Sequence, residues 1–198
     1  IRPPAFLPVG PAAPVPALSP DPVRMLGEDL VLFKMRGGQF GLIAESCPHR
    51  SVSLAYGIPA EDGIRCPYHG WLYGESGECL ERPMEAVPRG KFPRKLPAYP
   101  VQELGGMLFT YMGPLPAPAL PRWDLFVWPN AIRQIAINVL NCNWLQCQEN
   151  TVDPVHFEWT HNNTTQRQAG NFGPFSPKTL DLTVEDHEFG LVSRRYRE

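Results

Sequence analysis

Short apolar runs separated by glycine-rich turns fill residues 23 to 121. An apolar run at 30–33 leads to Gly37 and Gly38, and a second run follows at 40–43. This pattern is typical of two antiparallel strands joined by a tight turn. Further runs of the same kind lie at 71–73, 79–80 and 107–112. Because no 3.6-residue period is sustained in this segment, the sequence predicts an all-β domain.

The pattern changes in the last third of the chain. Residues 132–140 alternate in part and predict a strand, whereas 141–160 has the clearest helical pattern. Residues 164–177 are polar and interrupted by glycine and proline, which predicts a loop. Strict alternation at 180–184 predicts a strand, and 191–196 is a candidate partner strand. Together with the all-β segment, these elements indicate an α+β fold class.

Proline marks the expected boundaries, since 24 of the 198 residues are proline against a background of about 5%. Eight of them are Pro3, Pro4, Pro8, Pro11, Pro14, Pro16, Pro20 and Pro22. Proline lacks an amide donor and is excluded from sheet interiors. We therefore expect residues 1–22 to form an extended arm on the surface or on a partner subunit, or a flexible leader. Prolines at 114–121 predict a linker, which leaves domains at 23–121 and 122–198.

Composition narrows the class of protein. Eighteen basic and 20 acidic residues give a formal net charge of −2. The chain therefore lacks the excess positive charge that is typical of nucleic-acid-binding proteins. Hydrophobic residues make up 43% of the chain, enough for a packed core. No apolar run approaches the ~20 residues of a membrane span, and no signal segment is evident. Five cysteines without a compact disulfide spacing favour a cytoplasmic protein with free thiols or thiolate ligands.

Two short segments each combine one cysteine with one histidine: Cys47 with His49, and Cys66 with His69. Zinc could use these four side chains tetrahedrally. Zinc modules, however, more often place two cysteines in one segment and two histidines in the other. The mixed segments suit a two-iron cluster in which both cysteines bind one iron and both histidines bind the other.

These segments, CPHR from Cys47 and CPYHGW from Cys66, resemble the Rieske [2Fe-2S] motif. The sixteen residues between His49 and Cys66 match the spacing of Rieske oxygenases. The resemblance implies that both cysteines and both histidines hold the cluster. We expect Arg50 and Trp71 to shield the cluster by packing.

A second group of polar residues surrounds His156 and His161. Five residues turn an ideal α-helix by about 500°, so these histidines would not share one face; one of them must lie where the helix frays. Two histidines and a carboxylate would form a facial triad for non-haem iron. Alternatively, the histidines are buried and hydrogen-bonded, and Asp153 and Pro154 are the N-cap and first residue of a helix.

Residues 143–161 resemble the mononuclear iron motif of ring-hydroxylating oxygenases, in the phthalate dioxygenase-like branch. The resemblance implies that His156 and His161 bind Fe(II). It also implies that Asp153 is the catalytic bridge from His156 to His69 of a neighbouring subunit in a homo-oligomer such as a homotrimer. Asn150 matches an asparagine near the iron; alternatively, its side chain forms a hydrogen bond within a helix. Glu149 and Glu158 are expected to be structural. The third ligand is expected beyond residue 198. None of the downstream acidic residues Asp181, Glu185, Asp186 and Glu188 matches it.

The resemblance implies a terminal oxygenase that hydroxylates an aromatic substrate, especially an aromatic carboxylate, with dioxygen. A reductase, with or without a ferredoxin, would supply electrons from NAD(P)H. O- or N-demethylation is the alternative, and a Rieske electron carrier or a zinc module is less favoured. The fold implied is a Rieske domain followed by the first part of a helix-grip catalytic domain, with the start of the chain clipped. Cys79, Cys142 and Cys147 are left as free thiols.

Overall fold

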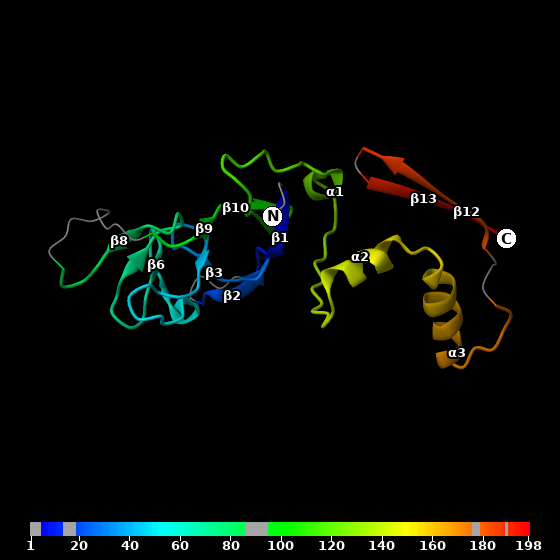
Figure 1. The fold of residues 1–198 in the computed structure, drawn as a ribbon, viewed down its shortest axis with the longest axis horizontal. Coiled ribbons are helices and arrows are strands. Elements are labelled where there is room, and N and C mark those ends of the chain that lie inside the picture. Colours follow the sequence, from blue (N-terminus) through cyan, green and yellow to red (C-terminus); the bar gives the residue numbers. More distant parts are fainter. Residues whose placement is uncertain (1–4, 14–18, 86–94, 176–178, 189) are drawn as a thin grey trace. The chain divides into compact units, whose positions relative to one another are not determined.

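The computed structural model describes residues 5–13, 19–85, 95–175, 179–188 and 190–198. It divides into two compact units, unit 1 at 1–137 and unit 2 at 138–198 (Figure 1). The division lies after Ile137 rather than after Pro121, because Trp123 and Phe126, which follow Pro121, still pack against Phe109 of unit 1.

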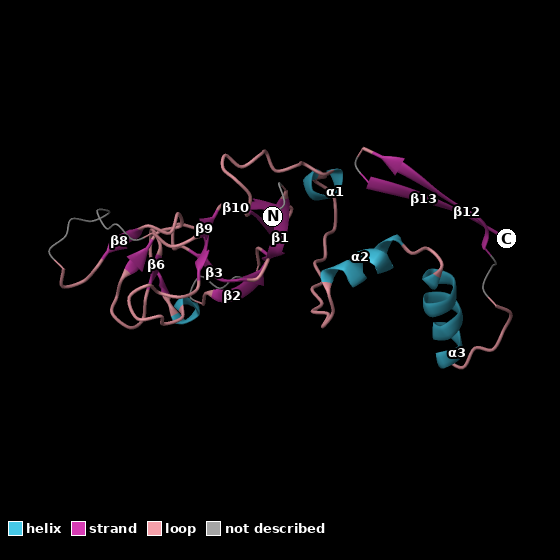
Figure 2. Cartoon of the chain, viewed as in Figure 1, coloured by secondary structure: helices cyan, strands magenta, loops and turns pink. Residues whose placement is uncertain are grey.

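Unit 1 is built from three small antiparallel sheets. A four-stranded sheet has the order β2 (Asp21–Met25), β3 (Glu28–Lys34), β4 (Phe40–Ala44) and β9 (Ala98–Tyr99). A second has the order β5 (Ile58–Pro59), β6 (Ile64–Arg65), β7 (Leu72–Tyr73) and β8 (Cys79–Glu81), and η1 (Leu54–Tyr56) precedes it. A three-stranded sheet has the order β1 (Phe6–Pro11), β11 (Met107–Tyr111) and β10 (Val101–Leu104), followed by the short helix α1 (Asp124–Val127). The expected all-β domain is confirmed (Figure 2).

The predicted hairpins form where the apolar runs placed them. β3 pairs with β4 and β7 with β8. The further strand predicted at 107–112 is β11, and it pairs with β10, a strand that the sequence did not predict. The turn between β10 and β11 uses Gly105 and Gly106, with φ of 62° and 84°, a backbone region that glycine enters without steric cost. Alternate residues of β3 and β4 face opposite sides, so Val31, Phe33 and Ile43 join one core cluster, while Leu30, Leu32 and Leu42 join another.

The proline-rich start is not a separate arm. β1 pairs antiparallel with β11, and Phe6 is buried against Tyr111 with ring centroids 5.6 Å apart. Its prolines are tolerated because β1 is an edge strand and its register shifts between Pro8 and Gly10. Residues 1–4 and 14–18 of the expected arm lie outside the described residues.

Unit 2 contains helices and one hairpin. Its elements are α2 (Trp144–Val152), η2 (Phe157–Thr164), α3 (Thr165–Gln168), β12 (Thr179–His187) and β13 (Gly190–Arg197). The predicted pairing of the last two strands is confirmed. The Asn143 side chain caps α2 by accepting from the amide of Leu145 at 2.9 Å.

Three features of the chain after residue 131 differ from the sequence prediction. The helix predicted for 141–160 breaks at Asp153 and Pro154, and helical structure continues to Gln168 through part of the predicted loop. The strand predicted for 132–140 is not formed, because it has no partner strand in the described part of the chain. Among the described residues, no helix combines the length and apolar character that crossing a bilayer requires.

Candidate metal-binding sites

The two Cys/His segments form loops of the same construction. The carbonyl of Cys47 accepts from the amide of Ser51 at 2.8 Å, and the carbonyl of Cys66 accepts from the amide of Gly70 at 3.0 Å. Each cysteine amide in turn donates to the carbonyl five residues later, at 3.0 and 2.8 Å. Ser51 and Gly70 both adopt positive φ, 56° and 72°. Each loop is therefore fixed by its own backbone before any ligand binds.

In this site the two cysteines lie next to each other, and the two histidines lie next to each other. The Cys47 and Cys66 side chains are next to each other and buried, at 1% and 4% exposure. The rings of His49 and His69 also meet, with centroids 4.5 Å apart at 66°, and His69 is exposed. Burial, together with the adjacent Cys47 thiol, raises the pKa of Cys66, while backbone hydrogen bonds from Tyr68 and His69 oppose this shift.

This pairwise arrangement fits a two-iron cluster better than one zinc ion. Within the described ranges, no three His, Cys, Asp or Glu side chains are grouped so that they could hold a single metal ion. A structural zinc needs four protein donors around one point. A Rieske cluster needs only two protein donors on each iron, cysteines on one and histidines on the other. The cysteine pair and the histidine pair have that arrangement.

An aromatic and cationic stack covers His49. The Trp71 ring lies parallel to the His49 ring, with centroids 4.6 Å apart at 4°. The guanidinium of Arg82, which follows β8, lies 4.8 Å from the Trp71 centroid. Desolvation, followed by the charge of His69, lowers the pKa of His49, which favours the neutral imidazole that a metal requires. The expected packing role holds for Trp71, whereas Arg50 is exposed.

Tyr73 is a candidate site residue that the sequence reasoning missed. Its side chain is fully buried, and its Oη lies 3.3 Å from Cys47 Sγ. Burial and the neighbouring Cys47 raise the pKa of Tyr73; the hydroxyl therefore stays protonated and is the donor. The available signal was the position of Tyr73 two residues after Trp71 in a predicted strand, because such residues share a face.

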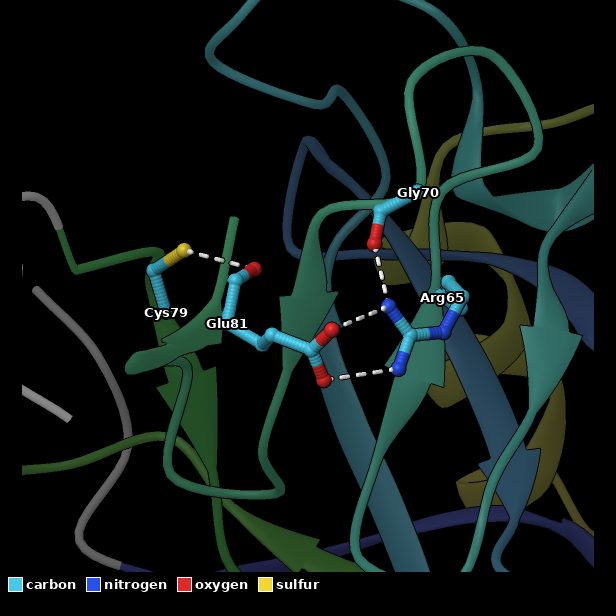
Figure 3. Close-up of polar contacts among 4 residues, drawn as sticks. All are labelled: Arg65, Gly70, Cys79 and Glu81. Atoms are coloured by element: carbon cyan, nitrogen blue, oxygen red, sulfur yellow. Dashed lines mark hydrogen bonds and ion pairs between the residues drawn. The ribbon is translucent and has the colours of Figure 1, made fainter. Parts of the chain in front are cut away.

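The ion pair of Arg65 and Glu81 stabilises the loop that follows Cys66 (Figure 3). Arg65 Nη1 donates to the Gly70 carbonyl at 2.6 Å, and Arg65 Nη2 donates to Glu81 Oε2 at 2.9 Å. The Arg65 hydrogen bond lowers the pKa of the Glu81 carboxyl. The Cys79 thiol, on the same strand β8, donates to the Glu81 carbonyl at 3.7 Å. Arg65 thus connects β6 to β8 and holds the loop that follows Cys66.

The second candidate site lies in unit 2, where a π-helix brings two histidines together. The rings of His156 and His161 have centroids 5.2 Å apart at 63°. The expectation that they diverge assumed α-helical geometry, but η2 is a π-helix that follows directly after His156. Its hydrogen bonds link residues five apart, so a five-residue spacing corresponds to one turn. π-helical turns occur frequently at functional sites.

Asp153 lies beside this histidine pair. Its Oδ1 accepts from the amide of Val155 at 2.8 Å, while Oδ2 lies 3.5 Å from His156 Nδ1. Asp153 is the C-cap of α2 and not the N-cap considered from the sequence, since η2 begins only after His156. His156 Nδ1 is buried and makes no hydrogen bond within the described structure. A buried, unsatisfied imidazole nitrogen beside a carboxylate fits a histidine whose orientation a metal and Asp153 would fix.

The remaining residues of this motif differ in their surroundings. Asn150 and Glu149 are exposed on α2. Glu158 Oε2 accepts from both the amide and the hydroxyl of Thr179, at 3.2 and 2.7 Å, which connects η2 to β12. Arg195 of β13 donates to the Pro154 carbonyl and lies over the Phe157 ring at 5.7 Å. The hairpin therefore supports both ends of the segment that carries His156.

The chain is similar in sequence and fold to known proteins. The Rieske [2Fe-2S] domain family matches residues 5–100. The chain is 50% identical over 181 residues to the 5,5'-dehydrodivanillate O-demethylase oxygenase subunit of Sphingobium sp. (strain NBRC 103272 / SYK-6), covering 89% of this chain and 43% of that protein. It is 42% identical over 172 residues to the phenoxybenzoate dioxygenase subunit alpha of Ectopseudomonas oleovorans, covering 77% and 42%. The oxygenase in the oxygenase–ferredoxin complex of carbazole 1,9a-dioxygenase superposes with a TM-score of 0.64 at 26% identity, covering 85% of this chain and 44% of that one.

Residues 5–100 belong to the Rieske [2Fe-2S] domain family, and the relatives described above are oxygenase subunits. The chain spans less than half the length of the curated relatives described above.

Proposed function

We propose that this chain is part of a terminal oxygenase subunit that hydroxylates an aromatic substrate. The observation that carries the proposal is the presence of two different donor sets in one chain. A buried cysteine pair lies beside a histidine pair in unit 1, and a second histidine pair lies beside Asp153 in unit 2. An electron carrier alone would have no use for the second set.

In this proposal Cys47 and Cys66 bind one iron of the cluster, and His49 and His69 bind the other. His156 and His161 bind a mononuclear iron. When bound, the cluster would supply single electrons and the mononuclear Fe(II) would activate dioxygen. A third, carboxylate ligand would come from outside residues 1–198.

Three side chains have specific roles beside the proposed cluster and the mononuclear iron. Tyr73 donates a hydrogen bond to the Cys47 sulfur, and Trp71 excludes water from one face of His49. Asp153 orients the His156 imidazole through Nδ1 and, in a homo-oligomer such as a trimer, would also accept from His69 of the partner subunit. This bridge would connect the two metal centres by hydrogen bonds.

The substrate class follows from the relatives and is part of the proposal. Phenoxybenzoate dioxygenase supports hydroxylation of an aromatic carboxylate, and the O-demethylase name of another relative supports the alternative, oxidative loss of a methyl group from a methoxyarene. A reductase, directly or through a ferredoxin, would deliver electrons from NAD(P)H; the relative solved with ferredoxin supports such a partner.

The test uses the full-length subunit with a compatible reductase. Reduction should produce the rhombic EPR signal of a Rieske cluster, and iron should approach about three atoms per subunit, two in the cluster and one mononuclear. His156→Ala should lose the third iron and keep the EPR signal, whereas Cys66→Ser should lose the signal. A panel of benzoates and methoxybenzoates under labelled dioxygen then separates ring hydroxylation from demethylation. Iron of two atoms per subunit that His156→Ala leaves unchanged would exclude the oxygenase.

A further inference from the structure

Two cysteines outside both metal sites meet at the beginning of α2. Cys142 Sγ and Cys147 Sγ are 3.6 Å apart, and neither cysteine is in a disulfide. Cys142 is exposed and Cys147 is partly exposed. Neither residue has a task in the proposed oxygenase chemistry.

The contact follows from the way α2 begins. Asn143 is the N-cap of α2, so Cys142 occupies the position before the cap and Cys147 the fourth helical position. Side chains at these two positions characteristically pack against each other and fix the entry angle of the chain. The helix start therefore holds the two sulfur atoms together by backbone geometry, independently of any metal.

We propose that Cys142 and Cys147 form a reversible disulfide when the protein meets a hydroperoxide. The Cys142 thiolate attacks the peroxide, the O–O bond breaks, and an alcohol or water leaves as a sulfenic acid forms. The Cys147 thiol then displaces water from that sulfenic acid and the S–S bond forms. In total two thiols lose two protons and two electrons, and one hydroperoxide is reduced to an alcohol and water.

Geometry and access both favour this pair over the other thiols. A disulfide requires an S–S separation of about 2.05 Å, and the two sulfur atoms are already in contact at 3.6 Å. Cys142 precedes the helix, so its backbone is not constrained by helical hydrogen bonds. By contrast, Cys47, Cys66 and Cys79 are buried, at 1%, 4% and 1% exposure, and Cys47 and Cys66 belong to the proposed cluster site.

The test is a mass measurement on the full-length holoprotein. Trypsin cleaves after Arg133 and Arg167, and no lysine or arginine lies between them; residues 134–167 therefore form one peptide with both cysteines. The protein is treated with hydrogen peroxide at concentrations that leave the cluster absorption unchanged, then alkylated with N-ethylmaleimide and digested. We expect this peptide to lose both alkyl groups and two hydrogen atoms, and dithiothreitol should restore both alkylations.

Single variants provide the matched controls. In Cys142→Ser the remaining thiol should stay alkylatable, and in Cys147→Ser the exposed thiol should stop at the sulfenic acid, which dimedone traps. Cluster absorption and circular dichroism verify that both variants fold. Two alkyl groups retained at every peroxide concentration would overturn the proposal. A sulfenic acid that persists in the wild type, or a disulfide that joins two peptides, would also overturn it.

Discussion

The hydroxyl of Tyr73 should set part of the reduction potential of the Rieske cluster. Tyr73→Phe removes one oxygen atom from a fully buried side chain and leaves the ring in place. The lost interaction is the contact of Tyr73 Oη with Cys47 Sγ at 3.3 Å. Hydrogen bonds to cluster sulfurs favour the reduced form, because that form carries one more negative charge. The substitution should therefore lower the potential.

The magnitude follows from the strength of one buried hydrogen bond. Such a bond contributes roughly 0.5–1.5 kcal/mol net. For a one-electron couple, about 59 mV corresponds to a tenfold change in the equilibrium constant, which is ~1.4 kcal/mol. If the bond acts mainly on the reduced state, the potential should fall by about 20–60 mV.

The assay is a redox titration of the cluster followed by circular dichroism or EPR. Tyr99→Phe is the matched control, because the Tyr99 hydroxyl is also largely buried but bonds to Glu28 Oε2 at 2.6 Å, away from the cysteines. Its potential should stay at the wild-type value. Equal potentials in wild type and Tyr73→Phe, with full cluster content in both, would refute the reasoning.

Three further predictions concern other parts of the chain. Asp153→Asn should retain both metals and lose nearly all turnover, measured by iron content and product formation; normal turnover would contradict the bridging role. Gly70→Ala should lower the free energy of unfolding by about 1–2 kcal/mol because of the positive φ, and further because the new Cβ would lie 3.0 Å from Pro83. Gly27→Ala, at φ of 84° with open space around it, should show only the backbone cost. Equal losses of unfolding free energy for the two variants in urea would argue against the Pro83 contact. Because the pKa of Glu81 is lowered when folded, its stabilising contribution is present above about pH 4.3 and is lost as the pH falls through the folded value. Glu81→Gln should therefore lower Tm at pH 7 and leave it unchanged in acid, and a pH-independent difference would oppose this assignment.

The local pattern predicted two hairpins of unit 1 and the candidate donor residues of the cluster loops. Each loop is closed by hydrogen bonds that span four or five residues, so the residues that fix its shape are neighbours in the sequence. The hairpins β3–β4 and β7–β8 likewise depend on adjacent apolar runs and the turns between them. For the same reason, the pairing of β12 with β13 was predictable.

Only the tertiary structure decided which distant segments meet. β1 pairs with β11, about a hundred residues later in the chain. Because local patterns do not reveal so distant a partner, the sequence predicted only an extended arm for the proline-rich start. Tyr73 reaches Cys47 across 26 positions of sequence, and no local spacing reports that contact. Residues 132–140 carry a strand pattern, but a strand forms only when a partner satisfies its backbone hydrogen bonds. The sequence by itself indicated which side chains are candidates to bind iron, because the cysteines and histidines of each motif are close neighbours in the chain. Packing and long-range pairing decided which sulfurs, rings and carboxylates lie within contact distance.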